Sequence, residues 1–369
     1  MPLKRNLVLG FIILLFLFLV APGVFAQSIS KEEFEQAQEL YKQKIEEIKR
    51  IDEKMQSSPD EYEKLKKDRE KLVAEVGQLR ESISTYGEMN EKIGDCRSIY
   101  REGVRLFRLR NYNDAIIKFD ECIQKGEELG TPVLNNVLFQ GAYNKGLSYL
   151  YLKKYNEAIN SYDQSLKYDP DNAGKSKVYY NFGLCYSRLG NNDRAKENFE
   201  KAIEFDSEYE KPYYELGTYY FNVKKDFENA YNYAAQAISK DEKYDRAYIL
   251  AGRALYELAK YDDAINYLMQ AIDLDTRKRY YEPDWYLAMS YNQKKEYNTA
   301  IEHARRSLTI KNNFGGAILE IGKAYKGLGN EAKALEYFEK LLKDRRWRQN
   351  GEYQIDMIKN KDKYIDGDF

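Results

Sequence analysis

Residues 143–162 read YNKGLSYLYLKKYNEAINSY, and the fold expected for most of the chain follows from this stretch. Gly146 and Ala158 lie twelve residues apart; Tyr149 follows the glycine by three positions and Tyr162 follows the alanine by four. Apolar residues three and four positions apart share one face of a helix, so the spacing predicts two amphipathic helices. The small residues Gly146 and Ala158 would let these helices approach closely, which predicts a helix–turn–helix unit.

The same pattern of small residues recurs along residues 94–346. A small residue is followed by an alanine twelve or thirteen positions later in seven places: Gly103 with Ala115, Gly146 with Ala158, Gly183 with Ala195, Gly217 with Ala230, Gly252 with Ala264, Ala288 with Ala300 and Gly322 with Ala334. The single thirteen-residue interval predicts an extra residue in the turn at Lys224-Lys225-Asp226. We predict an all-α stack of seven helix pairs, because one pair cannot bury its apolar face alone.

These units resemble the tetratricopeptide repeat, a helix–turn–helix unit of about 34 residues. The resemblance implies a right-handed α-solenoid of about seven repeats, in which the second, fifth, ninth and twelfth positions of each repeat face a concave groove. Carried onto this chain, it implies a partner-binding groove with aromatic residues along it and basic residues at its edge. These candidate residues are Arg97, Tyr100, Phe107, Tyr143, Lys177, Tyr180, Lys211, Tyr214, Phe221, Arg246, Tyr256 and Trp285.

Aromatic rings beside cations suit a protein or peptide segment that carries acidic and apolar side chains. Two other interpretations of the tyrosines stay open. Several of them could serve only to pack helices together, and an aromatic ladder could instead stack on sugars of the cell wall. We expect no enzyme activity, because no pair of nucleophile and base can be argued from the residues.

Residues 27–93 predict a coiled-coil helical hairpin with a turn at residues 57–61. Its second helix has a seam of residues spaced seven apart, namely Leu65, Leu72, Leu79, Tyr86 and Ile93. A second seam contains Arg69, Val76, Ile83 and Asn90. A seven-residue repeat sustained in this way is typical of a left-handed coiled coil. Either the two helices cover each other within one chain, or the seam binds a partner helix and the chain self-associates.

The first 26 residues have the layout of a signal peptide. Lys4 and Arg5 precede an apolar run from Leu7 to Ala21, and small residues favour cleavage after Ala26. An uncleaved anchor is the alternative, because residues 7–26 are long enough to span a bilayer. We expect an exported protein of the periplasm or cell envelope, with membrane contact only if residues 7–26 are retained.

The composition argues against several classes of function. Lys and Arg total 59 and Asp and Glu total 60, so no basic excess favours nucleic acid as a partner. With one histidine and three cysteines we expect no metal site and no cofactor, and we expect His303 to be a surface residue. Cys96 and Cys122 fall in one repeat and could form a disulfide, whereas Cys185 is expected to be a small core residue.

Residues 347–369 predict a C-terminal helix that caps the stack. The order of signal peptide, coiled hairpin and repeats is similar to that of periplasmic envelope coordinators that trimerise through the coil. We therefore expect a protein–protein interaction adaptor or scaffold of the bacterial cell envelope. The alternatives are a structural subunit of an envelope machine, such as a flagellar collar or secretion assembly, and a cell-wall glycan-binding module.

Overall fold

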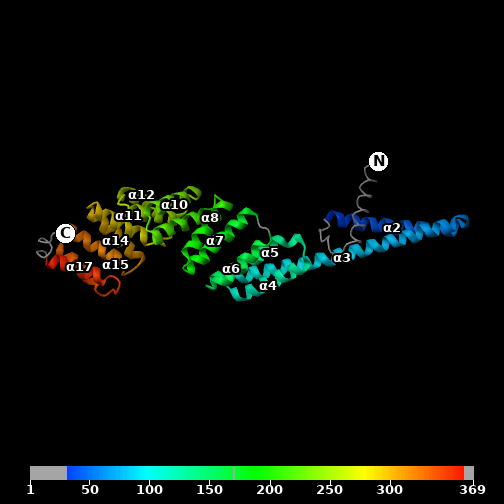
Figure 1. Ribbon diagram of the computed structural model, residues 1–369, viewed down its shortest axis with the longest axis horizontal. Helices are drawn as coiled ribbons and strands as arrows, with labels where there is room; N and C mark the ends of the chain where they lie inside the picture. Colours follow the sequence, from blue (N-terminus) through cyan, green and yellow to red (C-terminus); the bar gives the residue numbers. More distant parts are fainter. Residues whose placement is uncertain (1–30, 169–170, 361–369) are drawn as a thin grey trace. The chain divides into compact units, whose positions relative to one another are not determined.

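The computed structural model describes residues 31–168 and 171–360, which are almost entirely α-helical and divide into two compact units between Asp171 and Asn172 (Figure 1). The first unit contains α2 (Lys31–Ser57), α3 (Tyr62–Arg108), α4 (Tyr112–Leu129), α5 (Asn135–Tyr151) and α6 (Tyr155–Leu166). The second unit contains α7 (Asn172–Arg188), α8 (Asn192–Phe205), α9 (Glu210–Tyr219), α10 (Phe227–Lys240), α11 (Asp245–Glu257), α12 (Tyr261–Leu274), α13 (Glu282–Gln293), α14 (Tyr297–Ile310), α15 (Gly315–Gly327), α16 (Glu331–Leu341) and α17 (Arg348–Lys359). The expected signal peptide, residues 1–26, lies outside the described residues.

Helices α2 and α3 form an antiparallel hairpin, closed by a short 3₁₀ turn at Pro59–Glu61. The rings of Phe34 and Tyr86 lie 4.5 Å apart between the two helices. Arg69, at a core-type position, donates from Nε to the carboxylate of Asp52 at 2.5 Å. The two helices therefore cover each other within one chain, while supercoiling and binding of a second copy stay predictions.

Helix α3 continues without a break from the hairpin into the repeats. The boundary expected between residues 93 and 94 lies inside this helix, where Ile93 and Cys96 are buried and Gly94 is exposed. The last part of α3 is the first helix of the first repeat, and it packs against α4.

Seven helix pairs make up the repeats, as the sequence predicted. Each pair has a first helix (A) and a second helix (B): α3–α4, α5–α6, α7–α8, α9–α10, α11–α12, α13–α14 and α15–α16. Five of the six predicted glycines lie against the large residue sixteen positions later, and Gly217 instead faces Leu250 of the next repeat. A Cβ on Gly183 would lie 2.4 Å from a ring carbon of Phe199, and one on Gly322 would lie 2.3 Å from Phe338. The ring thus occupies the space where a larger residue would place its side chain, which explains the regular spacing.

The turns between A and B helices share one backbone conformation. Each turn has a residue in the left-handed region: Arg110, Lys153, Gly190, Lys225, Ala259, Lys295 and Gly329. In the fifth repeat the next amide, of Lys260, donates to the carbonyl of Leu255, five residues back, at 2.9 Å. Five of the seven residues are not glycine, so those turns carry backbone strain.

The fourth repeat places its extra residue differently from the prediction. A π-helical turn at Tyr220–Lys224 follows α9, and the amide of Asp226 donates to the carbonyl of Tyr220, six residues back, at 3.1 Å. The extra residue is therefore absorbed in the last turn of the A helix rather than at Lys224-Lys225-Asp226. A π-turn adds one residue while the helical hydrogen bonds continue, so Lys225 keeps the left-handed position.

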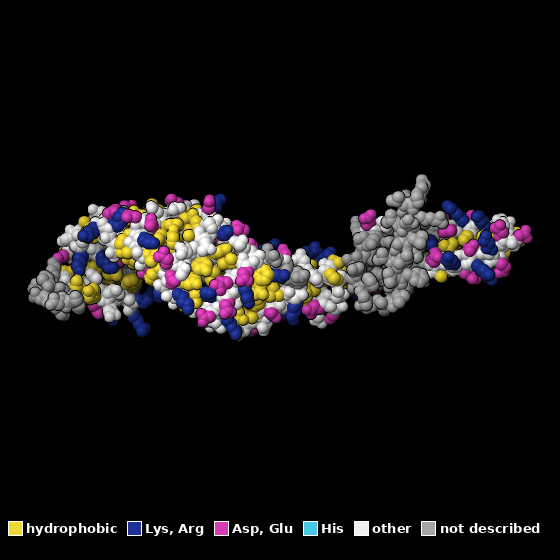
Figure 2. All heavy atoms as spheres, turned by 45° about the horizontal axis from the view of Figure 1, so that its top comes forward, with side chains coloured by type: hydrophobic (Ala, Val, Ile, Leu, Met, Phe, Trp, Pro, Cys, Tyr) yellow, Lys and Arg dark blue, Asp and Glu magenta, His cyan; other side chains and the backbone are white. Residues whose placement is uncertain are grey.

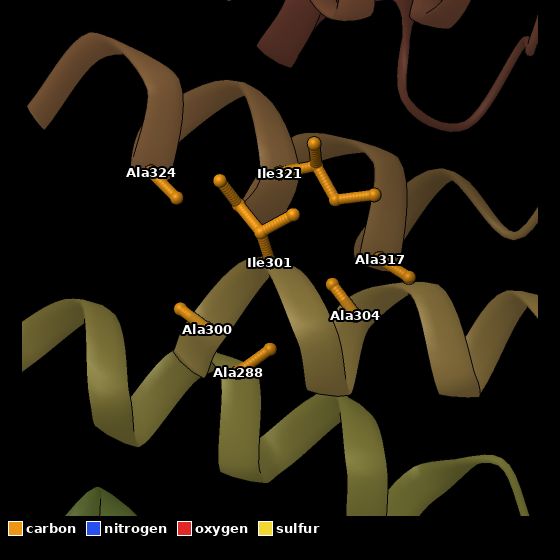
Figure 3. Close-up of a cluster of buried hydrophobic side chains, with 7 residues drawn as sticks. All are labelled: Ala288, Ala300, Ile301, Ala304, Ala317, Ile321 and Ala324. Atoms are coloured by element: carbon orange, nitrogen blue, oxygen red, sulfur yellow. The ribbon is translucent and has the colours of Figure 1, made fainter. Parts of the chain in front are cut away.

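Small buried residues fill the space between α13, α14 and α15 (Figure 3). The alanines point toward one another there, with two isoleucines between them: Ala288, Ala300, Ala304, Ala317, Ala324, Ile301 and Ile321. At the end of the stack α17 packs on α16 and buries Ile358 and Gly351. This helix lies within the expected cap; residues 361–369 of that cap lie outside the described part of the chain.

The expectation that His303 is a surface residue was wrong. His303 is buried on α14, and its Nδ1 lies 2.8 Å from Oδ1 of the buried Asp284 on α13. Its ring also stacks on that of Tyr291 at 5.4 Å. The charged neighbours of His303 on its own helix suggested exposure, whereas the residues that bury it lie on the preceding A helix.

Candidate functional site

Within each unit the A helices form a common surface, which we call the A-helix face. The A helices α3 and α5 contact each other in the first unit, as do α9, α11, α13 and α15 in succession in the second. Among the described residues, successive B helices make no comparable contacts. The A helices therefore lie on the inner side of the stack, where the groove was expected.

In the first unit the two predicted tyrosines are half-buried and already have contacts. Nδ2 of Asn144 donates to the hydroxyl of Tyr100 at 3.2 Å, and the ring of Tyr143 lies 5.7 Å from that of Tyr162. Burial raises the pKa of Tyr100. Of the three candidates Arg97, Tyr100 and Tyr143, Arg97 alone is exposed.

Phe107 belongs to a separate aromatic cluster beside the A–B turns of the first unit. Its ring lies 5.5 Å from that of Tyr112 and 5.7 Å from that of Tyr151. Tyr112 and Tyr151 stack on each other at 5.1 Å, and Tyr151 is well exposed. The structure shows no ring contact between Phe107 and the half-buried tyrosines Tyr100 and Tyr143.

In the second unit Tyr180 and Tyr214 each pack against a tyrosine just before the next A helix. The ring pairs are Tyr180 with Tyr209 and Tyr214 with Tyr244, both at 5.3 Å. Burial raises the pKa of Tyr180 and of Tyr214. The packing interpretation therefore applies to these rings, which leaves only part of each ring to a partner.

The predicted basic residues of the second unit are exposed. Lys177 and Lys211 lie on α7 and α9, and Arg246 on α11 donates from Nε to the hydroxyl of Tyr280 at 3.2 Å. Nζ of Lys211 lies 5.7 Å from the centre of the Tyr209 ring. Figure 2 shows one face of the chain, on which apolar patches lie among scattered charged side chains over the repeats.

Arg253 on α11 was missed in the sequence, although it occupies a ninth position that the family resemblance assigns to the groove. Its guanidinium lies 4.4 Å from the ring of Phe221 and 5.5 Å from that of Tyr286. No ion pair joins it to a described carboxylate, and its buried Nε has no hydrogen-bond partner among the described residues. The guanidinium of Arg253 therefore covers the ring of the buried Phe221. The ring of Tyr256 lies 5.7 Å from the ring of Tyr286, the other aromatic neighbour of Arg253.

Trp285 is covered by side chains of the chain itself. Its ring lies 5.0 Å from that of Phe314 and 6.4 Å from that of Trp347, which comes just before α17. Nζ of Lys311 covers the ring of Phe314 at 4.6 Å. The expected aromatic row is therefore filled by the chain's own side chains at this position.

Glu215 on α9 is a second residue that the sequence did not reveal. Burial raises the pKa of its carboxyl to about 7, although the positive charges of Arg188 and Arg246 oppose the shift. The side chain lines a cavity of about 160 Å³ between α7, α8 and α9, together with Ser187 and Thr218. This carboxyl changes its charge near neutral pH, beside the basic residues of the A-helix face.

Comparison with protein families assigns the repeats. Models described as tetratricopeptide repeat match residues 138–208, 245–277 and 316–343. The chain is a tetratricopeptide-repeat protein. Such repeats are protein-interaction modules, and the stacked units provide extended concave binding surfaces.

Solved structures with TM-scores above 0.5 agree with this fold. The C-terminal part of a TPR repeat-containing protein from Cytophaga hutchinsonii is 17% identical, with 68% of this chain and 98% of that chain covered and a TM-score of 0.52. PilF of Pseudomonas aeruginosa is 17% identical, with 60% and 99% covered and a TM-score of 0.51. A MamA structure is 26% identical over 48% of this chain and 94% of its own, with a TM-score of 0.42. No curated protein matches this tetratricopeptide-repeat protein.

The described helices were also compared with the length and hydropathy that a bilayer requires. None of those within residues 31–168 and 171–360 is long and apolar enough to cross a membrane.

Proposed function

We propose that this tetratricopeptide-repeat protein is a non-enzymatic adaptor that binds a protein or peptide segment along the A-helix face of its second unit. The proposal rests on the guanidinium of Arg253, held between the rings of Phe221 and Tyr286 at 4.4 and 5.5 Å. Rings that fix the orientation of an arginine reduce the entropy lost when it binds a carboxylate. The site therefore suits an acidic side chain of a partner.

The surroundings of Arg253 favour an extended or helical segment that is apolar as well as acidic. The exposed side chains of Lys177, Lys211 and Arg246 add positive charge on the A helices of the same unit. The half-buried Tyr214 and Tyr256 offer apolar area at a small cost in side-chain entropy. A segment with alternating acidic and apolar residues would use both kinds of contact.

We further propose that the adaptor works at the bacterial cell envelope. The support comes from residues 1–26, whose basic start, apolar run and small residues have the order of an export signal.

A structural subunit of an envelope assembly is the second candidate, and one observation on the hairpin favours it. Tyr62 and Val73 on α3 are 44% and 45% exposed. Apolar residues left open on a two-helix hairpin could be covered by further copies in an assembly. Light scattering of residues 27–369 should then show large oligomers that Val73→Glu dissociates. The glycan interpretation has less support, because Tyr180 and Tyr214 already pack against other tyrosines.

A library of random displayed peptides, selected on residues 27–369, tests the adaptor proposal. We expect selected peptides to combine acidic with aromatic or aliphatic residues. In fluorescence anisotropy, Arg253→Ala should lower the affinity for the synthetic consensus peptide by about tenfold or more, because a partly buried charge pair is lost.

Arg194→Ala provides the matched control, because Arg194 is an exposed arginine on the B helix α8. This variant should bind the consensus peptide as the unchanged protein does. Selected peptides without acidic residues, or binding that survives Arg253→Ala, would contradict the proposal.

A further inference from the structure

Two buried cysteines of the first repeat lie in contact. Sγ of Cys96 on α3 is 3.3 Å from Sγ of Cys122 on α4, and also 3.3 Å from the backbone carbonyl oxygen of Cys122. Both side chains are fully buried, in one cluster with Ile93, Leu134 and Leu138. The third cysteine, Cys185, is buried on α7 in the other unit and serves as an internal control.

We propose that Cys96 and Cys122 are an oxidative modification site and form an intramolecular disulfide that joins α3 to α4. Bonded sulfur atoms lie about 2 Å apart, so the two Sγ atoms need approach by only about 1 Å. Small rotations of two short side chains can supply that movement without separating the helices. The proposal is independent of what the A-helix face binds.

The oxidant is an external disulfide, either that of a thiol oxidoreductase or a small one such as oxidised glutathione. The thiolate of one cysteine attacks a sulfur of the oxidant, which forms a mixed disulfide and releases one thiol. The thiolate of the other cysteine then attacks the protein sulfur of the mixed disulfide and releases the second thiol. The pair loses two electrons and two protons, and the oxidant gains both.

Burial determines when this exchange can occur. Burial raises the pKa of the Cys122 thiol far above its usual range, and the contact with Cys96 adds to the shift. In the folded chain Cys122 therefore holds little thiolate, and the burial of both sulfur atoms leaves no open path to an oxidant. We expect the bond to form while the chain folds, before α3 and α4 have packed.

The bond would stabilise the part of α3 that leaves the hairpin. Along one face of this stretch, positions for a Cβ at Gly87 and Gly94 have no other atom within 4 Å, so that face of the helix is open. Cys96 is the first fully enclosed residue after it. A covalent link to α4 at this point would hold the emerging helix on the first repeat.

Refolding of residues 27–369 tests the proposal directly. The unfolded, reduced chain is refolded in a buffer of reduced and oxidised glutathione, denatured again, alkylated and weighed by intact mass spectrometry. We expect one alkylated cysteine, Cys185, and a mass lower by two hydrogen atoms before alkylation. The folded reduced chain, placed in the same buffer, should keep three thiols for much longer.

Two variants and a melting curve locate the bond and show that it matters. Cys185→Ala should still lose two hydrogens, whereas Cys122→Ala should not. The oxidised form of the unchanged chain should melt several degrees above its reduced form, a comparison that needs no variant. Three alkylated cysteines after oxidative refolding, or a bond that includes Cys185, would overturn the proposal.

Discussion

The hairpin and the repeats are both built from antiparallel helices, yet they bury side chains to different depths. In the hairpin the best-buried side chain, Leu79, keeps 4% of its surface exposed, whereas Phe119, Tyr162 and Phe338 in the repeats keep none. Two helices share one interface whose edges stay open to water. A repeat inside a stack is covered on both sides, so its core is enclosed.

The glycines show the same difference. A Cβ on Gly77 or Gly87 in the hairpin would have no other atom within 4 Å, whereas one on Gly183 or Gly322 would lie within 2.4 Å of a phenylalanine ring. An exposed glycine inside a helix only weakens that helix, whereas a glycine under a ring is required for packing. One residue type thus has opposite energetic roles in the two regions.

Removing a ring from the repeats should have the largest effect. Phe199 is 2% exposed, so we expect Phe199→Ala to lower the free energy of unfolding of the second unit by about 3–5 kcal/mol. Leu72→Ala, at a half-buried hairpin position, should cost clearly less, because water can enter the space that the side chain leaves. Urea unfolding followed by circular dichroism measures both variants. Equal losses would mean that the hairpin core is as closed as the repeats.

Adding one methyl group should change stability with opposite sign in the two regions. Gly183→Ala forces a carbon against the Phe199 ring, and overpacking of this kind costs about 2–3 kcal/mol. Gly77→Ala meets no atom and removes an unfavourable helix residue, so it should stabilise the hairpin by about 0.5–1 kcal/mol. Urea midpoints that move in the same direction for both variants would contradict this account.

The half-buried Glu215 of the repeats also predicts a pH dependence that the hairpin should lack. Burial raises the pKa of Glu215 from 4.5 to about 7, so folding favours its neutral form. The contribution of Glu215 to the free energy of unfolding is therefore most favourable below pH 4.5, and it is lost as pH rises through about 7.

Glu215→Gln should remove this loss and stabilise the second unit at pH 8 by about 1–2 kcal/mol, after allowance for screening by water. The advantage should disappear at pH 4. Glu46→Gln, on the exposed face of the hairpin, is the control and should give no such profile. An advantage of Glu215→Gln that is the same at both pH values would show that the carboxyl is not buried in solution.

Much of the fold could be predicted because its packing rule is local in sequence. A glycine and the ring sixteen positions later belong to the same repeat, as with Gly183 and Phe199, so one repeat contains both halves of the contact. The π-turn at Tyr220–Lys224 escaped prediction, because the count of residues shows that one is added but not which hydrogen bonds absorb it.

Less of the candidate site could be predicted, because the surroundings of each site residue depend on contacts between repeats. Arg253 lies between Phe221 and Tyr286, which are both more than thirty residues away in the sequence. Trp285 was expected to be open, yet Trp347, which precedes the cap helix, covers it. Exposure at a given repeat position is thus set by the neighbouring repeats, which a repeat pattern does not specify.

The turns allow the finest test of the comparison. Among the described residues, no residue of the hairpin has a positive φ, whereas Ala259 between α11 and α12 has a φ of 58°. A Cβ in this conformation is strained, so Ala259→Gly should stabilise the second unit by about 0.5 kcal/mol after the entropy that glycine gains on unfolding is subtracted. Ala74→Gly, at an exposed position inside α3, should instead lower the free energy of unfolding by about 0.5–1 kcal/mol, because a right-handed helix favours alanine over glycine. Differential scanning calorimetry of both variants measures the difference, and a lower melting temperature for Ala259→Gly would show that the turn is not strained.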